Sequence, residues 1–154
     1  MGNYLMEFLK KLIFKYTSFG APKYKFNIEP IQLVSFINEI ERLSDVSGNI
    51  VEIGVSRGLT TRFICEHIRS SGYSESLKYF ALDTFSSFTK EDIDFEVDKR
   101  GKSRDEFVGF RCNDFDVWTK NFLEFDFLKP IKADCSTYNY QQIGPLKLAF
   151  LDVD

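Results

Sequence analysis

Apolar and polar positions alternate along the chain in a pattern that predicts two helices before the first strand. Between residues 5 and 16, apolar side chains recur at helical spacing with lysines between them, which predicts an amphipathic helix. This helix is expected to end at Gly20-Ala21-Pro22, and a linker is expected to run to Asn27. Pro30 suits the first turn of a second helix. The buried stripe of that helix is expected to consist of Val34, Ile37, Ile40 and Leu43.

Four strands are expected after these helices, and the first is expected to be buried, because it is a short, mostly apolar run that meets glycines. The first run begins at Asn49 and meets two glycines, Gly54 and Gly58. A helix-compatible segment extends from Leu59 to Ser70, with Gly72 as its C′ residue. The other three strands are expected over residues 78–85, 129–134 and 146–154.

A charged segment and an aromatic segment separate the second and third strands. Residues 90–106 hold seven acids and five bases, which predicts a solvated, mobile insertion. Loops that follow the carboxyl ends of parallel strands often cover a ligand. The next segment repeats large aromatic residues at the spacing of one helix face, so these side chains are expected in the core. They are Phe115, Trp118, Phe122 and Phe125.

Composition narrows the class of protein. A chain of 154 residues is expected to form one domain with a real core. A hydrophobic fraction of 44% excludes wholesale disorder, and most of the 17 phenylalanines are expected in the core or in a lid. The formal net charge of -3 provides no basic field, so no nucleic-acid partner is expected.

Cysteine spacing and hydropathy bear on the compartment. Cys65, Cys112 and Cys135 are far apart and form no C-x-x-C motif, which predicts reduced thiols, a cytoplasmic location and no zinc site. No apolar run approaches the ~20 residues of a membrane span. His67 falls within the helix after the glycines and is expected on its surface.

The first helix could lie on a membrane surface, since its polar side is basic. The commoner case is packing on the domain or on a partner chain, which makes a homodimer plausible.

The first strand, the two glycines and the following helix form the candidate binding turn. Glycine lets the backbone approach a ligand or adopt positive φ, and free N–H groups at a helix start favour an anionic or polar group. The spacing E-x-G-x-x-x-G runs from Glu52 to Gly58. It differs from G-x-G-x-x-G, and no third glycine opens the helix, which disfavours a nicotinamide or sugar-nucleotide site. A strand–glycine–helix turn that binds no ligand is the alternative.

Acidic residues also end the later strands. Asp83 ends the second strand, where a nucleoside-binding α/β unit places the acceptor for ribose hydroxyls. The alternative for Asp83 is a helix N-cap or a turn acid. Asp134 and Asp152 end the third and fourth strands. Open α/β sheets bind ligands at the carboxyl edge, so these acids are expected to lie together.

These motifs resemble class I S-adenosylmethionine-dependent methyltransferases. Within that superfamily, VEIGVSRGLTT, ALDTFSSF and IGPLKLAFLDVD are most similar to the macrocin O-methyltransferase family, over about residues 49–154. The resemblance implies an α/β fold with a Rossmann-like, doubly wound, mainly parallel sheet, preceded here by two N-terminal helices. It also implies methylation of a small-molecule hydroxyl, on a sugar or natural product, with S-adenosylmethionine and Mg²⁺.

The resemblance implies cofactor contacts for five residues of the first two strands. The backbone of Gly54, Ser56 and Gly58 would line the methionine part of the cofactor. Glu52 would anchor the turn or contact the methionine end, and Asp83 would bind the ribose hydroxyls.

The later matching residues are implied to hold the adenine and the reacting groups. Asp134 and the amides of Cys135 and Ser136 would lie by the adenine. Asp152 would lie next to the transferred methyl as a base or metal ligand. Asp152 and Asp154, as D-x-D, resemble the carboxylates near the family's metal.

The family continues past this D-x-D with a tyrosine, more metal-binding acids and three further strands. The chain is therefore expected to be the N-terminal two-thirds of a methyltransferase, with residues 1–48 as N-terminal helices and 49–154 as a partial cofactor-binding domain. The fourth strand would then present an unpaired apolar edge. A non-catalytic or inactive S-adenosylmethionine-binding module is the alternative function.

Overall fold

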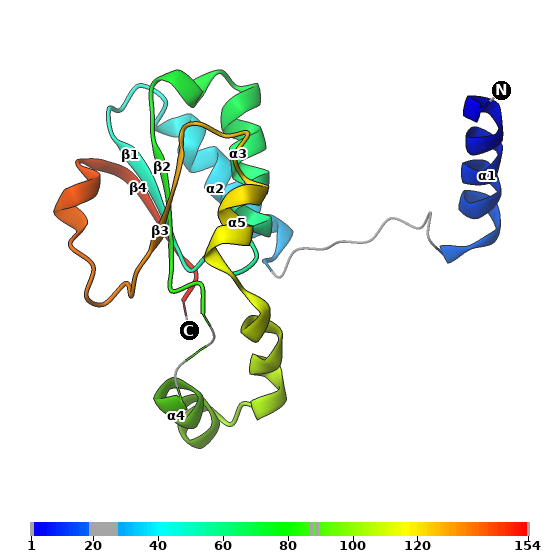
Figure 1. Ribbon diagram of the computed structural model, residues 1–154. Helices are drawn as coiled ribbons and strands as arrows, with labels where there is room; N and C mark the ends of the chain where they lie inside the picture. The colour runs from blue at the N-terminus through cyan, green and yellow to red at the C-terminus, as the bar shows by residue number, and fades with distance from the viewer. Residues whose placement is uncertain (1, 19–27, 87, 89, 154) are drawn as a thin grey trace.

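A four-stranded, all-parallel sheet in the order β3-β2-β1-β4 forms the centre of the fold (Figure 1). The computed structural model describes residues 2–18, 28–86, 88 and 90–153. This sheet confirms the predicted α/β class with a Rossmann-like parallel arrangement. The strands are β1 (Asn49–Ile53), β2 (Tyr79–Asp83), β3 (Leu128–Lys132) and β4 (Leu146–Leu151).

Within the described residues, two α-helices precede β1, as predicted, and three follow it. The expected end of the first helix at residues 20–22 and the expected linker to Asn27 lie outside the described residues. The α-helices are α1 (Gly2–Tyr16), α2 (Pro30–Arg42), α3 (Leu59–Ser70), α4 (Lys90–Arg100) and α5 (Phe115–Asn121). Short 3-10 helices are η2 (Tyr73–Glu75), η3 (Arg104–Cys112) and η4 (Tyr140–Ile143).

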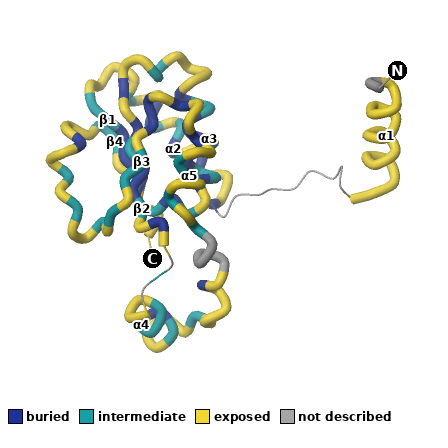
Figure 2. The backbone as a smooth tube through the Cα atoms, viewed as in Figure 1, coloured by how far each residue is buried: buried dark blue, intermediate teal, exposed yellow. Residues whose placement is uncertain are grey.

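The two faces of the sheet are covered differently (Figure 1). Helices α2, α3 and α5 pack on one face, where the larger apolar cluster lies. The connection from β3 to β4, which contains η4, covers the other face over a smaller cluster around Val51 and Leu82. Most residues of β1 and β2 are buried, whereas none of β4 is (Figure 2).

The buried stripe of α2 differs from the predicted one. Val34, predicted to be buried, is 51% exposed, whereas Phe36 is buried. Phe36 stacks on Phe150 of β4 with ring centroids 4.6 Å apart. The helix carries apolar residues on two adjacent rows, and this aromatic contact selects the row that faces the sheet. The buried residues of α2 are Leu33, Phe36 and Ile40.

The aromatic row after the insertion lies in the core, as predicted, but only part of it is helical. Helix α5 ends at Asn121, so Phe122 and Phe125 belong to the turn that follows. Trp118, Phe122 and Phe125 are all buried. The rings of Trp118 and Phe122 stack with centroids 4.1 Å apart.

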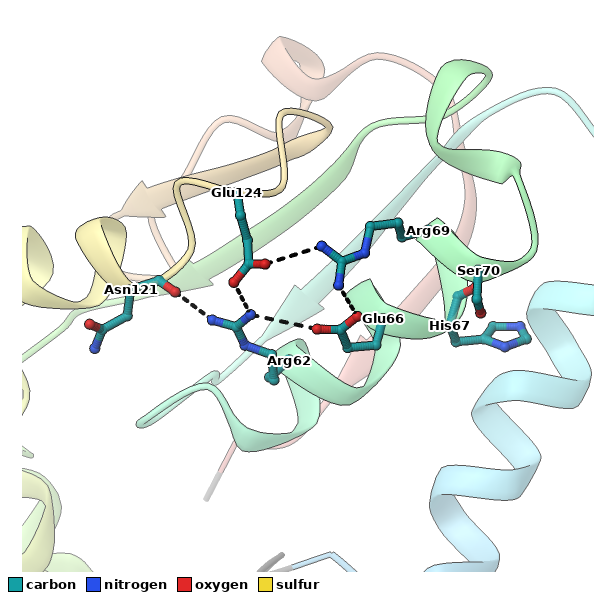
Figure 3. A network of polar contacts seen from close by, with 7 residues as sticks. All are labelled: Arg62, Glu66, His67, Arg69, Ser70, Asn121 and Glu124. Carbon is teal, nitrogen blue, oxygen red and sulfur yellow. Dashed lines mark hydrogen bonds and ion pairs between the residues drawn. The ribbon is translucent and has the colours of Figure 1, made fainter. Parts of the chain in front are cut away.

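A polar network on α3 holds this turn in place (Figure 3). Arg62 donates hydrogen bonds to the carboxylate of Glu124 and to the carbonyl of Asn121. Arg69 also donates to Glu124, with an N–O distance of 3.1 Å. The guanidinium carbon of Arg62 lies 4.8 Å from the ring centroid of Phe122, which adds a cation–π contact. Two charged side chains of one helix therefore clamp the connection between α5 and β3.

The edge strand β4 pairs only with β1 within the described residues. On its other side no described strand pairs with it, as expected from the sequence, and Leu151 is 63% exposed. A groove of about 290 Å³ between this strand and α2 is lined by apolar side chains that include Ile31, Phe36 and Phe150.

Helix α1 stands apart from the α/β part of the molecule (Figures 1 and 2). Its large apolar side chains are 38 to 83% exposed, so none of them packs into the described core. Among the described residues, no helix combines the length and apolar character needed to cross a membrane.

Candidate functional site

The carboxyl ends of the four strands meet at one edge, because the sheet is parallel. The segment that carries α4 and η3 follows β2 and lies beyond this edge (Figure 1). It is mostly exposed, as its charge predicts, but it contains a small core of its own. Phe107 is buried, and Glu96 is buried between Arg100 and Lys102, each with a nitrogen 3.0 Å from the carboxylate.

Gly54 allows the end of β4 to approach the turn after β1. Its φ is +85°, and an added Cβ would lie 2.1 Å from the carbonyl oxygen of Asp152. The amide of Gly54 donates to the carbonyl of Leu82, and the amide of Asp152 donates to the carbonyl of Ile53, each at 2.9 Å. The close approach at Gly54 is thus between two protein segments.

Gly58 places the start of α3 against the aromatic core. It is the N-cap of α3 with φ +81°, and an added Cβ would lie 2.6 Å from Cζ of Phe122 and 2.8 Å from Nε1 of Trp118. Glycine has no side chain with which to cap the helix. Capping of the first α3 amides therefore falls to other groups or to a ligand at the carboxyl edge.

Asp83 holds this turn through three backbone amides. Its Oδ2 accepts from Val55 and Ser56, both at 2.9 Å, and its Oδ1 accepts from Phe85 at 2.7 Å. These contacts are those of a turn acid, which was one of the two alternatives from the sequence. The hydroxyl of Thr84 is a fourth donor, at a longer distance of 3.5 Å from Oδ1. A carboxylate has about four acceptor positions, so a ribose hydroxyl would take the place of the Thr84 hydroxyl.

Ser56 is held from both sides. Its φ is +46°, which is uncommon for a residue with a Cβ. Its amide donates to Asp83, and its carbonyl accepts from Nδ2 of Asn113 at 2.9 Å. The backbone that was expected to line the methionine part of the cofactor is therefore fixed by contacts with β2 and with the segment that precedes α5.

Glu52 anchors α3 and β2 to β1 from inside the core. Its side chain is 1% exposed, and its Oε2 accepts from the hydroxyls of Thr61 at 2.7 Å and Tyr79 at 2.6 Å. Burial raises the pKa of Glu52 to about 7, although the hydrogen bonds from Tyr79 and Thr61 oppose this shift. Burial next to Glu52 likewise holds the pKa of Tyr79 well above its usual range. Of the two roles implied for Glu52, these contacts correspond to anchoring the turn.

The turn after β3 is closed by its own acid. Oδ1 of Asp134 accepts from the amide of Ser136 at 2.8 Å and from its hydroxyl at 2.7 Å. These two bonds, the hydroxyl first, lower the pKa of Asp134. The carbonyl of Cys135 accepts from the hydroxyl of Tyr140 at 2.9 Å. The exposed carboxylate of Asp134 and the half-buried Cys135 lie on the surface available to a ligand at this edge.

Asp152 follows β4 and is exposed, next to the glycine turn. Asp154, the other predicted metal ligand, lies outside the described residues. Within the described part of the chain, no group of three His, Cys, Asp or Glu side chains could hold a metal ion. Mg²⁺ is usually held by one or two carboxylates with water and substrate, so Asp152 is a described carboxylate that could contribute to such a site.

His67 lies in the last turn of α3, at the end of the helix away from the glycine turn. Nε2 of His67 lies 2.8 Å from Oε1 of Glu41, and its side chain is 18% exposed, so it is more covered than the predicted surface histidine. Cys65 is a free, buried thiol, and burial raises its pKa. Cys135 is also a free thiol.

Three contributors to the site were not predicted from the sequence: Asn113, Thr61 and Tyr79. The hydroxyl of Tyr79 begins an otherwise apolar strand, and that polar atom was a signal for a buried partner. Asn113 gave no signal, because its contact with Ser56 joins residues 57 positions apart.

In comparisons with known proteins, no family model and no curated protein matches the sequence. The class defined by the structure is a Rossmann-like α/β fold with a glycine turn at the carboxyl edge of the sheet.

Proposed function

We propose that this chain is an S-adenosylmethionine-dependent methyltransferase domain that modifies a small-molecule hydroxyl. The observation that carries the proposal is the turn from β1 to α3. It combines left-handed Gly54 and Gly58 with a start of α3 that has no side-chain cap at its N-cap residue. Such a helix start favours an anionic group, and the methionine part of the cofactor ends in a carboxylate.

The other acids of this edge support the same assignment. Asp83 could accept from a ribose hydroxyl in place of the 3.5 Å contact from the Thr84 hydroxyl. Asp134 presents an exposed carboxylate beside the edge. The charged segment with α4 lies beyond the strand ends and is placed to limit access of water to a bound ligand. The free thiols of Cys65 and Cys135 fit a reducing compartment such as the cytoplasm.

S-adenosylmethionine, when bound, supplies an electrophilic methyl group on a sulfonium. The side chains of the protein would position the acceptor oxygen against that methyl group and would accept the proton of the acceptor hydroxyl. Asp152 is the candidate base, because it is an exposed carboxylate adjacent to the glycine turn.

A module that binds the cofactor without transferring the methyl is the second candidate. It would use the same glycine turn, and the described residues include no group of three metal-ligating side chains that could assist the acceptor step. The two functions differ in the acceptor step and share the cofactor site.

Calorimetric titration of the whole chain tests the shared site. S-adenosylmethionine and S-adenosylhomocysteine are expected to release or absorb heat on binding, whereas NAD⁺ is not. Asp134→Ala is expected to weaken the cofactor about tenfold, as loss of about 1.4 kcal/mol would. Asp126→Ala is the matched control, since Asp126 is an exposed aspartate before β3, at the opposite edge of the sheet.

Circular dichroism of the same samples establishes that the chain is folded. A folded chain that binds neither adenosyl compound, or that binds NAD⁺ instead, contradicts the proposal. Binding of the cofactor without transfer of a labelled methyl group to any of a panel of sugar and phenol acceptors favours the non-catalytic module.

A further inference from the structure

Helix α1 carries a broad apolar stripe that nothing in the described part of the chain covers. The stripe follows i, i+4, i+7, i+8 spacing, and Met6 and Phe8 widen it on its two sides. The central side chains remain 38% exposed at Leu12 and 64% exposed at Leu5. The members of the stripe are Leu5, Met6, Phe8, Leu9, Leu12, Ile13 and Tyr16.

Lysines border this stripe on both sides. Lys10 is a helical neighbour of Met6 and Ile13, and Lys11 and Lys15 lie on the side of Phe8 and Leu12. The ammonium of Lys15 lies 5.1 Å from the ring centroid of Tyr16, so its aliphatic stem runs along the apolar surface.

The charge of α1 is opposite to that of the remaining chain. Its three lysines and one glutamate, Glu7, give it a net charge of +2. The whole chain carries -3, so the remainder carries -5. A negatively charged surface would therefore attract α1 and repel the α/β part.

We propose that α1 lies in the plane of an anionic phospholipid bilayer surface. The apolar stripe enters the boundary between headgroups and acyl chains, and the three lysines lie at the level of the lipid phosphates. This placement is independent of the function proposed above.

The length and charge of α1 favour a lipid surface over the other ways of covering the stripe. A helix of 15 residues is about 22 Å long, which is shorter than the hydrocarbon core of about 30 Å. It therefore lies on a bilayer and does not cross it. Pairing of two α1 helices would bring like charges together. It would also leave part of the stripe exposed, because a coiled-coil seam uses only the a and d positions.

Co-sedimentation of the whole chain with lipid vesicles tests the proposal. Vesicles of phosphatidylcholine alone are compared with vesicles of equal parts phosphatidylcholine and phosphatidylglycerol. Wild type is expected to sediment with the anionic vesicles, at least tenfold more tightly than with the neutral ones, and to be released by salt.

Three sets of variants separate the contributions of the two faces. The triple change Lys10→Gln, Lys11→Gln and Lys15→Gln is expected to weaken anionic binding on the order of 100-fold, from about 1 kcal/mol per lysine. Leu12→Glu is expected to abolish binding. Glu7→Gln is the matched control on the polar face and is expected to bind at least as tightly as wild type.

Two results would overturn the proposal. One is wild type that stays in solution with anionic vesicles; the other is a triple lysine variant that binds as wild type does. Light scattering distinguishes the alternative occupant. If wild type is a dimer that Leu12→Glu converts to a monomer, and neither wild type nor any variant binds vesicles, a second copy of the chain covers α1 instead. Because α1 does not pack on the core, thermal unfolding of all variants is expected to match wild type and serves as the folding check.

Discussion

The carboxylate of Asp83 accepts a hydrogen bond from the amide of Ser56 at 2.9 Å, which joins the end of β2 to the turn after β1. Ser56 adopts φ +46°, a conformation that costs of order 1–3 kcal/mol for a residue with a Cβ. The same carboxylate also binds the amides of Val55 and Phe85. Asp83 therefore stabilises a strained turn, whether or not it also binds a ribose.

Replacing Asp83 is expected to destabilise the chain in the absence of any ligand. Asp83→Ala removes a charged acceptor from three amides, and the expected loss in the free energy of unfolding is about 2–3 kcal/mol. Urea denaturation measures this loss, and hydrogen exchange should accelerate at the amides of Val55 and Ser56. Equal stability of wild type and Asp83→Ala would show that the turn is held by other contacts. Asp126→Ala provides the control for loss of an aspartate.

The buried Glu52 predicts an unusual dependence of stability on pH. Its pKa is about 7 in the folded chain, raised by burial from an ordinary value of 4.5. The folded state therefore binds more protons than the unfolded state between these values, so stability falls as pH rises from about 5 to 7. The contribution is about 3 kcal/mol across this range.

Glu52→Gln is expected to remove this contribution, because the amide oxygen can still accept from Thr61 and Tyr79 without titrating. Urea denaturation at several pH values should show a shallower decline in the variant than in wild type. Parallel curves for the two proteins would mean that Glu52 titrates normally. Groups whose pKa is lowered in the folded chain, such as Asp134, change the stability only at more acidic pH. Their titration therefore does not obscure the difference between the two proteins.

Gly58 and Gly72 form a matched pair for testing close packing at the turn. Both adopt positive φ, +81° and +76°, but an added Cβ meets Phe122 and Trp118 at Gly58 and nothing within 4 Å at Gly72. Gly72→Ala is expected to cost about 1 kcal/mol from backbone strain alone. Gly58→Ala adds overpacking, for a total of about 3 kcal/mol. Equal losses in urea denaturation would contradict the tight contact between α3 and the aromatic row.

The clamp formed by Arg62 and Glu124 is expected to show greater coupling than an ordinary surface pair. Arg62 also contacts Asn121 and the ring of Phe122, so it joins several groups at once (Figure 3). A double-mutant cycle with Arg62→Ala and Glu124→Ala measures the coupling through the free energy of unfolding.

The control for this cycle is the exposed pair of Arg42 and Glu39, which lies on α2 alone. Its coupling is expected to be smaller and to vanish at high salt. Arg62→Lys should lose most of the clamp, because a lysine cannot bond to two separated acceptors in a planar fork. Equal coupling in the two cycles would show that the clamp is only a surface ion pair.

Local pattern was enough to predict most of the elements. The run from Asn49 to Ile53 is short and mostly apolar, and Gly54 and Gly58 end it before a helix, so β1 and α3 appear where they were expected. Gly72 follows α3 with φ +76°, as predicted for a C′ residue. The α/β class followed from the alternation of these strands and helices.

The sequence by itself determined where the strands, the glycine turns and three of the helices lie, because these depend on residues close together in the chain. Only the tertiary structure decided what the side chains contact. It placed β4 beside β1 at an edge of the sheet, turned Phe36 of α2 toward Phe150, and directed Asp83 to the amides of the neighbouring turn. Those outcomes depend on packing between residues that are distant in the sequence, which a local pattern of apolar and polar positions does not encode.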